Sequence, residues 1–353
     1  MITPARPLRQ GESMTVVVQY SGVPSTVTAA GFVAWTRTPD GGLAVGEPEM
    51  AWWWFPSNDH PLDKATFDIS VMVPNGTEVL SNGVMPSPPV PVINGWSRWS
   101  WRSVRPMATY LAFVVIGQYD IQTSTTADGQ QVITAYSDAL GDSDGAARAS
   151  VERTAEITDW ESGLFGPFPF EARGGVVVPP GFLGFALETQ TRPVYAASFF
   201  RRGANPYVIA HENAHQWFGD SVSVAGWRNI WLNEGFARYV EWLFSEAQGE
   251  GTAQELFERC SCTSCGTGQP AAGTATARSS SSKRWPSSCP ARASVDFSPG
   301  GCSRRADPTW APPRWRPATA RRSNRSPGGS SRKHPGTEPL RLRQGPRLRQ
   351  GPV

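Results

Sequence analysis

The sequence predicts an α+β fold with two folded parts, an antiparallel β-domain and a following domain of strands and helices, and then a tail. Three observations predict it. Short apolar or alternating runs between turn-prone residues fill residues 1–122, which is typical of paired strands. Strand patterns followed by helix patterns fill residues 123–259, as in α+β domains. Regular patterning stops after residue 259, and residues 260–353 are rich in Ser, Pro, Arg and Gly.

The first part is predicted to be an antiparallel β-domain. Its strand-like runs contain many Val, Thr, Phe and Trp residues, which half-buried pleated surfaces favour. The first run arrives with almost no lead-in, so we expect this domain to be incomplete at its beginning. The expected strands cover residues 14–20, 31–36, 66–73, 96–101 and 109–119.

The second part is predicted to combine a sheet with helices, and it also is expected to be incomplete. Apolar side chains at helical spacing predict a helix over residues 146–165. Pro206 favours the start of a helix over 206–218, and Gly249 fits the C-cap of a helix over 233–248. A further helical segment is expected over residues 253–259. The expected strands cover residues 131–136, 174–178, 182–195 and 221–227.

The charge is distributed very unevenly along the chain. The formal net charge is +3, but residues 260–353 hold 17 Lys and Arg and only 3 Asp and Glu. This composition cannot bury enough apolar surface to offset chain entropy, so the tail is predicted to be disordered. Its abrupt start and its terminal repeat RLRQGP-RLRQGP resemble the product of a shifted reading frame. The alternative is a genuine basic tail that binds polyanions.

The sequence shows no targeting or membrane segment. No run of about 18 apolar residues exists, so no transmembrane helix is expected. The N-terminus lacks the apolar core of a signal peptide. The protein is expected to be cytoplasmic if this N-terminus is genuine, and secretion stays open if residues are missing before it. All five cysteines lie in the tail, so the first 259 residues give no information on redox compartment.

The strongest chemical signal is the H-E-x-x-H motif that begins at His211. On a helix, His211 and His215 lie four residues apart on one face, so both imidazoles can reach one zinc ion. Glu212, one residue along, is placed to take a proton from water as a general base. The alternative is a coincidence of two helical histidines, but the chain has only four histidines and two lie in this motif.

A catalytic zinc needs a third protein ligand and an open position. Glu234 lies 19 residues after His215 and opens the next expected helix, so it is the candidate. The alternative is a solvent-facing glutamate in a first helical turn, where the helix dipole favours negative charge.

The stretch HENAHQWFGD, followed by WLNEGFA, resembles the zinc signature of the aminopeptidase N family of gluzincin metallopeptidases. The resemblance covers roughly residues 10–259. It implies a thermolysin-like catalytic domain, one zinc ion per chain and peptide substrates with a free N-terminus. The implied activity is that of a zinc-dependent aminopeptidase, in which Glu212 acts as general base.

A second stretch, from Gly184 to Glu188, resembles the G-A-M-E-N exopeptidase motif of that family. The family's first Gly is replaced by Phe185 or displaced to Gly184, and Thr189 stands where the family has Asn. The resemblance implies that Glu188 binds the free α-amino group of the substrate and that Ala186 lies in the substrate-binding strand. The segment Asp59 to Phe67 resembles the family's D-x-P-x-x-K-x-x-F pattern, for which a structural role is expected.

The resemblance also exposes a difference. The family stabilises the oxyanion with a Tyr well downstream of the third ligand, whereas the last Tyr of this chain is Tyr239. The chain as written is therefore expected to have impaired activity or none. Two other functions stay open: a non-catalytic β-domain protein with a polyanion-binding tail, and an endopeptidase that shares H-E-x-x-H. The tail has no Tyr or Phe run for base stacking, so no nucleic-acid partner is expected. The oligomeric state stays open.

Overall fold

The computed structural model describes residues 6–29, 32–33 and 35–264. Most of the basic tail, with its predicted disorder, lies outside these residues. The tail was expected to begin at residue 260, but helix α5 (Ala253–Ser264) continues through that position. Adding a residue to a formed helix costs far less than nucleating one, so the helix that begins at Ala253 extends past the change in composition.

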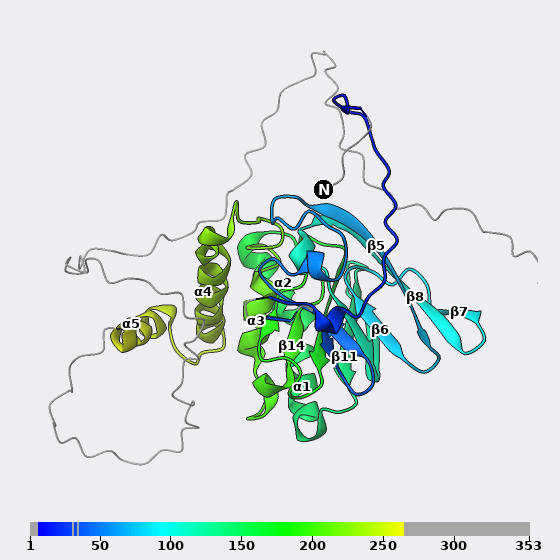
Figure 1. Ribbon diagram of the computed structural model, residues 1–353. Helices are drawn as coiled ribbons and strands as arrows, with labels where there is room; N and C mark the ends of the chain where they lie inside the picture. Colours follow the sequence, from blue (N-terminus) through cyan, green and yellow to red (C-terminus); the bar gives the residue numbers. More distant parts are fainter. Residues whose placement is uncertain (1–5, 30–31, 34, 265–353) are drawn as a thin grey trace, which may run out of the picture. The chain divides into compact units, whose positions relative to one another are not determined.

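The N-terminal part is an antiparallel β-domain, as predicted (Figure 1). A four-stranded sheet has the order β3-β4-β9-β6, a three-stranded sheet has the order β5-β8-β7, and β1 pairs with β2. Every pairing in these sheets is antiparallel. The strands are β1 (Thr28–Ala29), β2 (Phe32–Val33), β3 (Thr36–Arg37), β4 (Gly42–Ala44), β5 (Ala65–Pro74), β6 (Glu78–Ser81), β7 (Val90–Ile93), β8 (Trp96–Met107) and β9 (Val114–Gly117).

Several predicted strands differ from the structure. The strands expected at 66–73 and 96–101 are confirmed as β5 and β8. Residues 14–20 form no strand. Their side chains are largely exposed, and their backbone pairs with no sheet among the described residues. The expected strand at 109–119 is divided into a 3₁₀ turn, Thr109–Leu111, and strands β9 and β10.

The second part contains a five-stranded sheet of order β10-β11-β12-β14-β13. The three central strands are parallel, and β10 and β13 are antiparallel edge strands. Because β10 pairs with β11 from Tyr119 onward, the change of sheet falls a few residues before the expected boundary at 123. The strands are β10 (Tyr119–Thr125), β11 (Gln131–Ser137), β12 (Ala172–Val178), β13 (Ala186–Leu187) and β14 (Val194–Ala196).

Two predictions in this part were too long. One strand was expected over 182–195, but β13 and β14 are separated by a buried loop, Glu188–Pro193. One helix was expected over 146–165, but the chain forms α1 (Asp144–Val151) and α2 (Thr154–Phe165). The hydroxyl of Thr154 donates to the carbonyl of Val151 at 2.6 Å and competes with continuous helical bonding at this break.

The remaining helices are α3 (Pro206–Ala214) and α4 (Trp231–Ala247). Helix α3 begins at Pro206 as predicted, with the Asn205 side chain as its cap, but it ends four residues before position 218. Helix α4 ends in a Schellman turn at Gly249, where φ is 71°. Residues 221–227 contain one isolated bridge and the start of a 3₁₀ turn rather than a strand, so turns return the chain.

The five-stranded sheet is the middle layer of the folded part. Side chains alternate along its strands: Val176 and Val178 face a core shared with the β-domain, while Val177 faces a second core beneath the helices. Figure 1 shows α2 and α3 on one side of this sheet and β5–β8 on the other. Strand β13 and helix α3 contact each other in this arrangement. No helix among the described residues combines the length and apolar character that crossing a membrane requires.

Candidate metal centre and adjoining cavity

Helices α3 and α4 pack against each other and bring the three predicted metal ligands together. Nε2 of His211 lies 3.4 Å from Oε2 of Glu234, and Nε2 of His215 lies 3.7 Å from Oε1 of the same carboxylate. One ligand atom from each residue lies within 4.8 Å of the others. A helical i, i+4 histidine pair and a first-turn carboxylate therefore point at one place, as the sequence predicted.

The other nitrogen of each imidazole is also held. Nδ1 of His211 lies 2.7 Å from Oε1 of Glu241, and Nδ1 of His215 donates to the carbonyl of Phe218 at 3.1 Å. Metal-binding histidines commonly have such carboxylate or carbonyl partners, which fix the ring and leave the opposite nitrogen for the ion. The donor set of two imidazoles and one carboxylate fits zinc with an open position.

The charges around His211 also suit a cation. Burial lowers the pKa of His211, but its hydrogen bonds with Glu234 and Glu241 outweigh burial, and the net pKa lies well above the usual value. Burial raises the pKa of Glu234 and Glu241, but the hydrogen bond of each with His211 and the nearby positive charges together outweigh burial and hold both pKa values below normal. The surroundings therefore stabilise positive charge where a metal ion would lie.

Two further predicted residues, Glu188 and Glu212, lie close to His215. Glu188, Glu212 and His215 are all buried, and one ligand atom of each lies within 4.8 Å of the others. Burial raises the pKa of Glu212 to about 8, partly opposed by the positive charge of His211. The site thus combines the two imidazoles that are candidate metal ligands with two buried carboxyl groups that are not among the predicted ligands.

Glu188 is fixed through its backbone and through its carboxylate. Nε2 of Gln216 donates to the Glu188 carbonyl at 3.0 Å, and the hydroxyl of Tyr110 donates to Oε1 of Glu188 at 3.2 Å. Oε1 of the Gln216 side chain accepts the N–H of Thr191 at 2.8 Å. Gln216 is fully buried and directly follows His215. The side-chain amide of Gln216 therefore connects the end of α3 to the loop that carries Glu188.

The β-domain holds the other side of this loop. Oγ1 of Thr191 accepts the N–H of Gly83 at 2.8 Å, and Nη2 of Arg192 donates to the Gly83 carbonyl at 3.1 Å. The side chain of Asn82 donates to the Gln190 carbonyl at 2.9 Å. Thr191 has a φ of 73°, which a non-glycine residue adopts only when its surroundings enforce it. Gly83 is required because a Cβ there would lie 1.9 Å from the Arg102 carbonyl oxygen.

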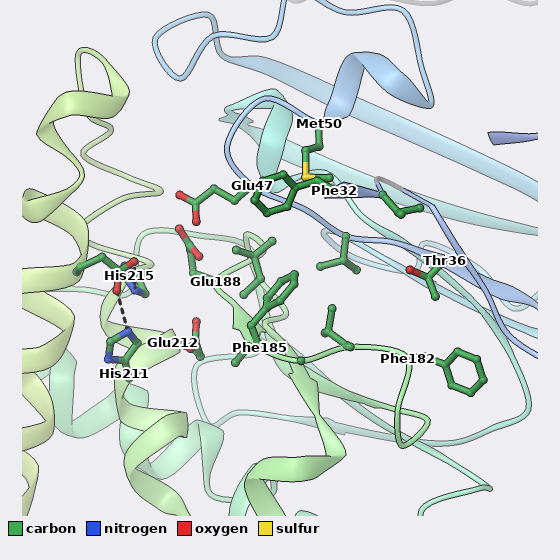
Figure 2. Close-up of a pocket in the computed structure, with 17 residues that line it drawn as sticks. Phe32, Thr36, Glu47, Met50, Phe182, Phe185, Glu188, His211, Glu212 and His215 are labelled. Atoms are coloured by element: carbon green, nitrogen blue, oxygen red, sulfur yellow. Dashed lines mark ion pairs between the residues drawn. The ribbon is translucent and has the colours of Figure 1, made fainter. Parts of the chain in front are cut away.

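A cavity of about 390 Å³ is lined by both histidines and by the carboxyl groups of Glu188, Glu212 and Glu234 (Figure 2). The histidines and Glu212 lie at one end, and Glu47 of the β-domain points toward Glu188 across the space. Burial, and then the nearby carboxylates of Glu188, Glu234 and Glu212, raise the pKa of Glu47 well above its usual value. The half-buried Ala186, also predicted to contact substrate, lies in the wall.

All six predicted site residues thus line one cavity. The sequence reasoning missed four other residues that line the cavity or hold the residues that line it. Glu241 had a usable signal, because it lies seven residues after Glu234 and therefore on the same face of α4. Gln216 adjoins a predicted ligand, but two of its side-chain partners, Glu188 and Thr191, are distant in sequence. Glu47 and Tyr110 lie in the β-domain, and nothing in their local pattern places them at a metal site. Asp59 has the expected structural role, since its carboxylate accepts the N–H of Ala51 and the hydroxyl of Thr109.

Comparisons with known proteins agree with this geometry. The peptidase M1 N-terminal domain matches residues 1–111, and the peptidase family M1 domain matches residues 193–276. The chain belongs to peptidase family M1. This confirms the resemblance to aminopeptidase N that the motifs indicated. Aminopeptidase N of Mus musculus is 33% identical to this M1 chain over 205 residues, which are 54% of the chain and 21% of the mouse protein.

Solved structures of the family have the same fold. The M1 zinc metallopeptidase of Deinococcus radiodurans superposes with a TM-score of 0.58 and 27% identity, covering 67% of this chain and 53% of that one. A mutant of that metallopeptidase bound to a Tyr-Ser-Ala substrate has a TM-score of 0.56 and 29% identity, covering 65% of this chain and 53% of that one. This M1 chain spans about a fifth of the curated relatives that it matches and about half of these structures.

Proposed function

We propose that this chain carries the site of a zinc-dependent aminopeptidase that removes single residues from the N-terminus of peptides. The observation that carries the proposal is the meeting of His211, His215 and Glu234 beside the two buried carboxyl groups of Glu188 and Glu212. We propose one zinc ion per chain, bound by the two imidazoles and Glu234. The solved structure of an M1 metallopeptidase with Tyr-Ser-Ala supports peptides as the substrate class.

The residues of this chain divide the chemistry between them. When bound, zinc supplies a Lewis acid that polarises a carbonyl oxygen and lowers the pKa of water. Glu212 takes a proton from the attacking water and passes it to the leaving amine. A proton acceptor works best when its pKa lies near the working pH, and burial raises the pKa of Glu212 to about 8.

The free amine of the substrate is held by carboxylates. Glu188 is fixed by Gln216 and Tyr110, and Glu47 lies across the cavity from it. An ammonium group between these carboxylates forms charge-assisted hydrogen bonds, which are stronger than neutral ones. Strand β13, which contains Ala186, is an edge of its sheet, so its outer side can pair with a peptide backbone. The carboxylates that hold the free amine favour an exopeptidase over an endopeptidase.

Zinc content and hydrolysis of an alanyl or leucyl amide test this proposal on the full chain. We expect one zinc per chain, lost in His211→Ala and retained in His60→Ala, an exposed histidine whose Nδ1 accepts the N–H of Leu62. Cleavage of a peptide that disappears on N-acetylation would exclude the endopeptidase. A folded wild-type chain that binds no zinc would overturn the proposal, and zinc with no turnover would leave the metal site standing and remove the activity.

A further inference from the structure

The cavity has two chemically different ends. The histidines and four carboxyl groups lie at one end, and Figure 2 shows Phe185, Phe32 and Met50 beyond Glu188 and Glu47. Among the described residues of the lining, Thr36 has the only polar side chain apart from the carboxylates and the histidines. The apolar lining consists of Phe32, Val33, Val45, Met50, Phe182, Leu183, Phe185, Ala186 and Leu187.

Part of this apolar lining is exposed to water. Phe185 is 43% exposed and Phe32 is 57% exposed, although both line a concave site. Covering apolar surface is favourable in proportion to the area removed from water, at about 25 cal/mol per Å². A ligand with an apolar side chain gains this free energy in the cavity, whereas a small or charged side chain does not.

Phe185 is the part of this wall that sets the chain apart. It stands where the exopeptidase motif has Gly, so a bulky ring occupies a position that has no side chain in the motif. Its backbone carbonyl accepts the N–H of Ala196 at 3.2 Å, which fixes the residue beside the edge strand β13. The ring is three residues before Glu188 and faces the same cavity.

The carboxylates fix which part of a ligand meets this wall. If the free amine lies between Glu188 and Glu47 and the carbonyl lies at the metal ligands, the adjoining side chain is confined to the rest of the cavity. Glu47 offers a competing possibility, because its Oε1 is buried and has no hydrogen-bond partner among the described residues. A second cation on the ligand could pair with it. The amine of every ligand already supplies a donor to this carboxylate, so the apolar surface decides between side chains.

We propose that this site selects ligands whose N-terminal side chain is large and apolar, and that Phe185 is a specificity residue that contacts that side chain. The inference rests on the proposed function, since it takes the amine position from Glu188. It concerns a different part of the cavity, so the two can fail separately.

Calorimetric titration of the zinc-loaded full chain with free amino acids tests the inference without requiring turnover. The probes are L-phenylalanine, L-leucine, L-alanine and L-arginine, with N-acetyl-L-phenylalanine as the control for the amine. We expect phenylalanine and leucine to bind about tenfold more tightly than alanine or arginine, as expected for burial of part of a large side chain. Acetylation should abolish binding.

Phe185→Ala should remove most of the preference for phenylalanine and leave alanine binding within about twofold. Phe185→Leu, which keeps an apolar side chain, should retain most of it. The matched control is Phe257→Ala on α5, a phenylalanine of similar exposure, 46%, outside the cavity, which should bind all probes like the wild type.

Each outcome decides the inference. Equal binding of alanine and phenylalanine, tighter binding of arginine, or an unchanged preference in Phe185→Ala would overturn the selectivity while the proposed function stands. Zinc loading without binding of any amino acid would overturn both the amine site and the selectivity. A chain that is folded but takes up no zinc would refute the proposed function first and this inference with it.

Discussion

The two ends of the cavity are built in opposite ways. At the metal end, His215, Glu212 and Glu188 are buried, and His211, His215 and Glu188 are each held by at least one further group that fixes the orientation. At the apolar end, Phe32 and Phe185 are exposed, and the strand that carries Phe32 is only two residues long. The side chains at the metal end are therefore held in position by many mutual contacts. The apolar surface, which would contact the ligand's side chain, is held by few. Substitutions at the first end should be costly and those at the second should be tolerated.

The largest effect is expected at Glu212. Glu212→Gln keeps the shape and removes the proton acceptor, so amide hydrolysis should fall about 10²- to 10⁴-fold. Zinc content should stay at the wild-type level, because Glu212 is not one of the three proposed ligands. Hydrolysis rates and metal analysis on the same preparations measure both, and a variant with full activity would show that another group accepts the proton.

Gln216→Leu should come next. The substitution leaves the N–H of Thr191 and the carbonyl of Glu188 without their present partners, and each such buried group costs about 1–3 kcal/mol. We expect the free energy of unfolding to fall by about 2–4 kcal/mol in urea denaturation. The KM for an amide substrate should also rise more than kcat falls, because Glu188 loses its anchor. An unchanged KM would mean that Gln216 has only a structural role.

Glu241→Gln tests the support of the metal ligands. The variant can still bond to Nδ1 of His211 but no longer supplies the negative charge that stabilises a cation on the other side. Loss of such an outer partner typically weakens metal binding about 10- to 100-fold. Competition with a zinc chelator measures the affinity, and Glu246→Gln on the same helix is the control. Equal zinc affinities in the two variants would contradict the role assigned to Glu241.

Glu161 contrasts with the carboxylates of the site that accept hydrogen bonds, such as Glu188 and Glu241. It is fully buried, and neither of its oxygens has a hydrogen-bond partner among the described residues. Burial raises its pKa well above the usual value, so the folded chain keeps a proton that the unfolded chain releases. Its contribution to stability is therefore complete below the unfolded pKa and is lost as the pH rises through the folded pKa.

Glu161→Gln should remove this dependence on pH. We expect the variant to be about 1–2 kcal/mol more stable than the wild type at pH 8, with the difference shrinking toward pH 4. Urea denaturation at several pH values measures the difference. A variant that is less stable at pH 8 would show that the carboxylate is ionised and stabilised by a partner.

The smallest effect is expected at the apolar end. Phe32→Ala should change the free energy of unfolding by less than about 0.5 kcal/mol, because exposed positions away from caps and cores tolerate substitution. Urea denaturation, as for Gln216→Leu, measures this change in the free energy of unfolding. A loss comparable with that of Gln216→Leu would erase the contrast between the two ends of the cavity.

Sequence patterns predicted that His211, His215 and Glu234 come together, because their positions depend on spacing along two helices. His211 and His215 share a helical face, and Glu234 follows at the start of the next helix, so local periodicity was sufficient. Long regular strands such as β5 and β8 were predicted for the same reason.

The failures lie where contacts distant in sequence decide the structure. Residues 14–20 alternate like a strand, but no described strand pairs with them. The loop Glu188–Pro193 lies between apolar stretches that are typical of a strand, yet its hydrogen bonds with Asn82, Gly83 and Gln216 bend it. The contributions of Glu47 and Tyr110 to the site likewise depend on how the β-domain meets the sheet, which no local pattern encodes.

The fastening of residues 190–192 to Asn82 and Gly83 limits how this architecture can be recombined. A β-domain transplanted from a relative would bring its own version of that turn, and the turn must present the same backbone groups to Thr191 and Arg192. A chimera with its crossover between residues 83 and 188 would take the turn at Asn82 and Gly83 from one parent and residues 190–192 from the other. Such hybrids should retain zinc binding, which depends on α3 and α4, but lose recognition of the free amine unless both segments are inherited together.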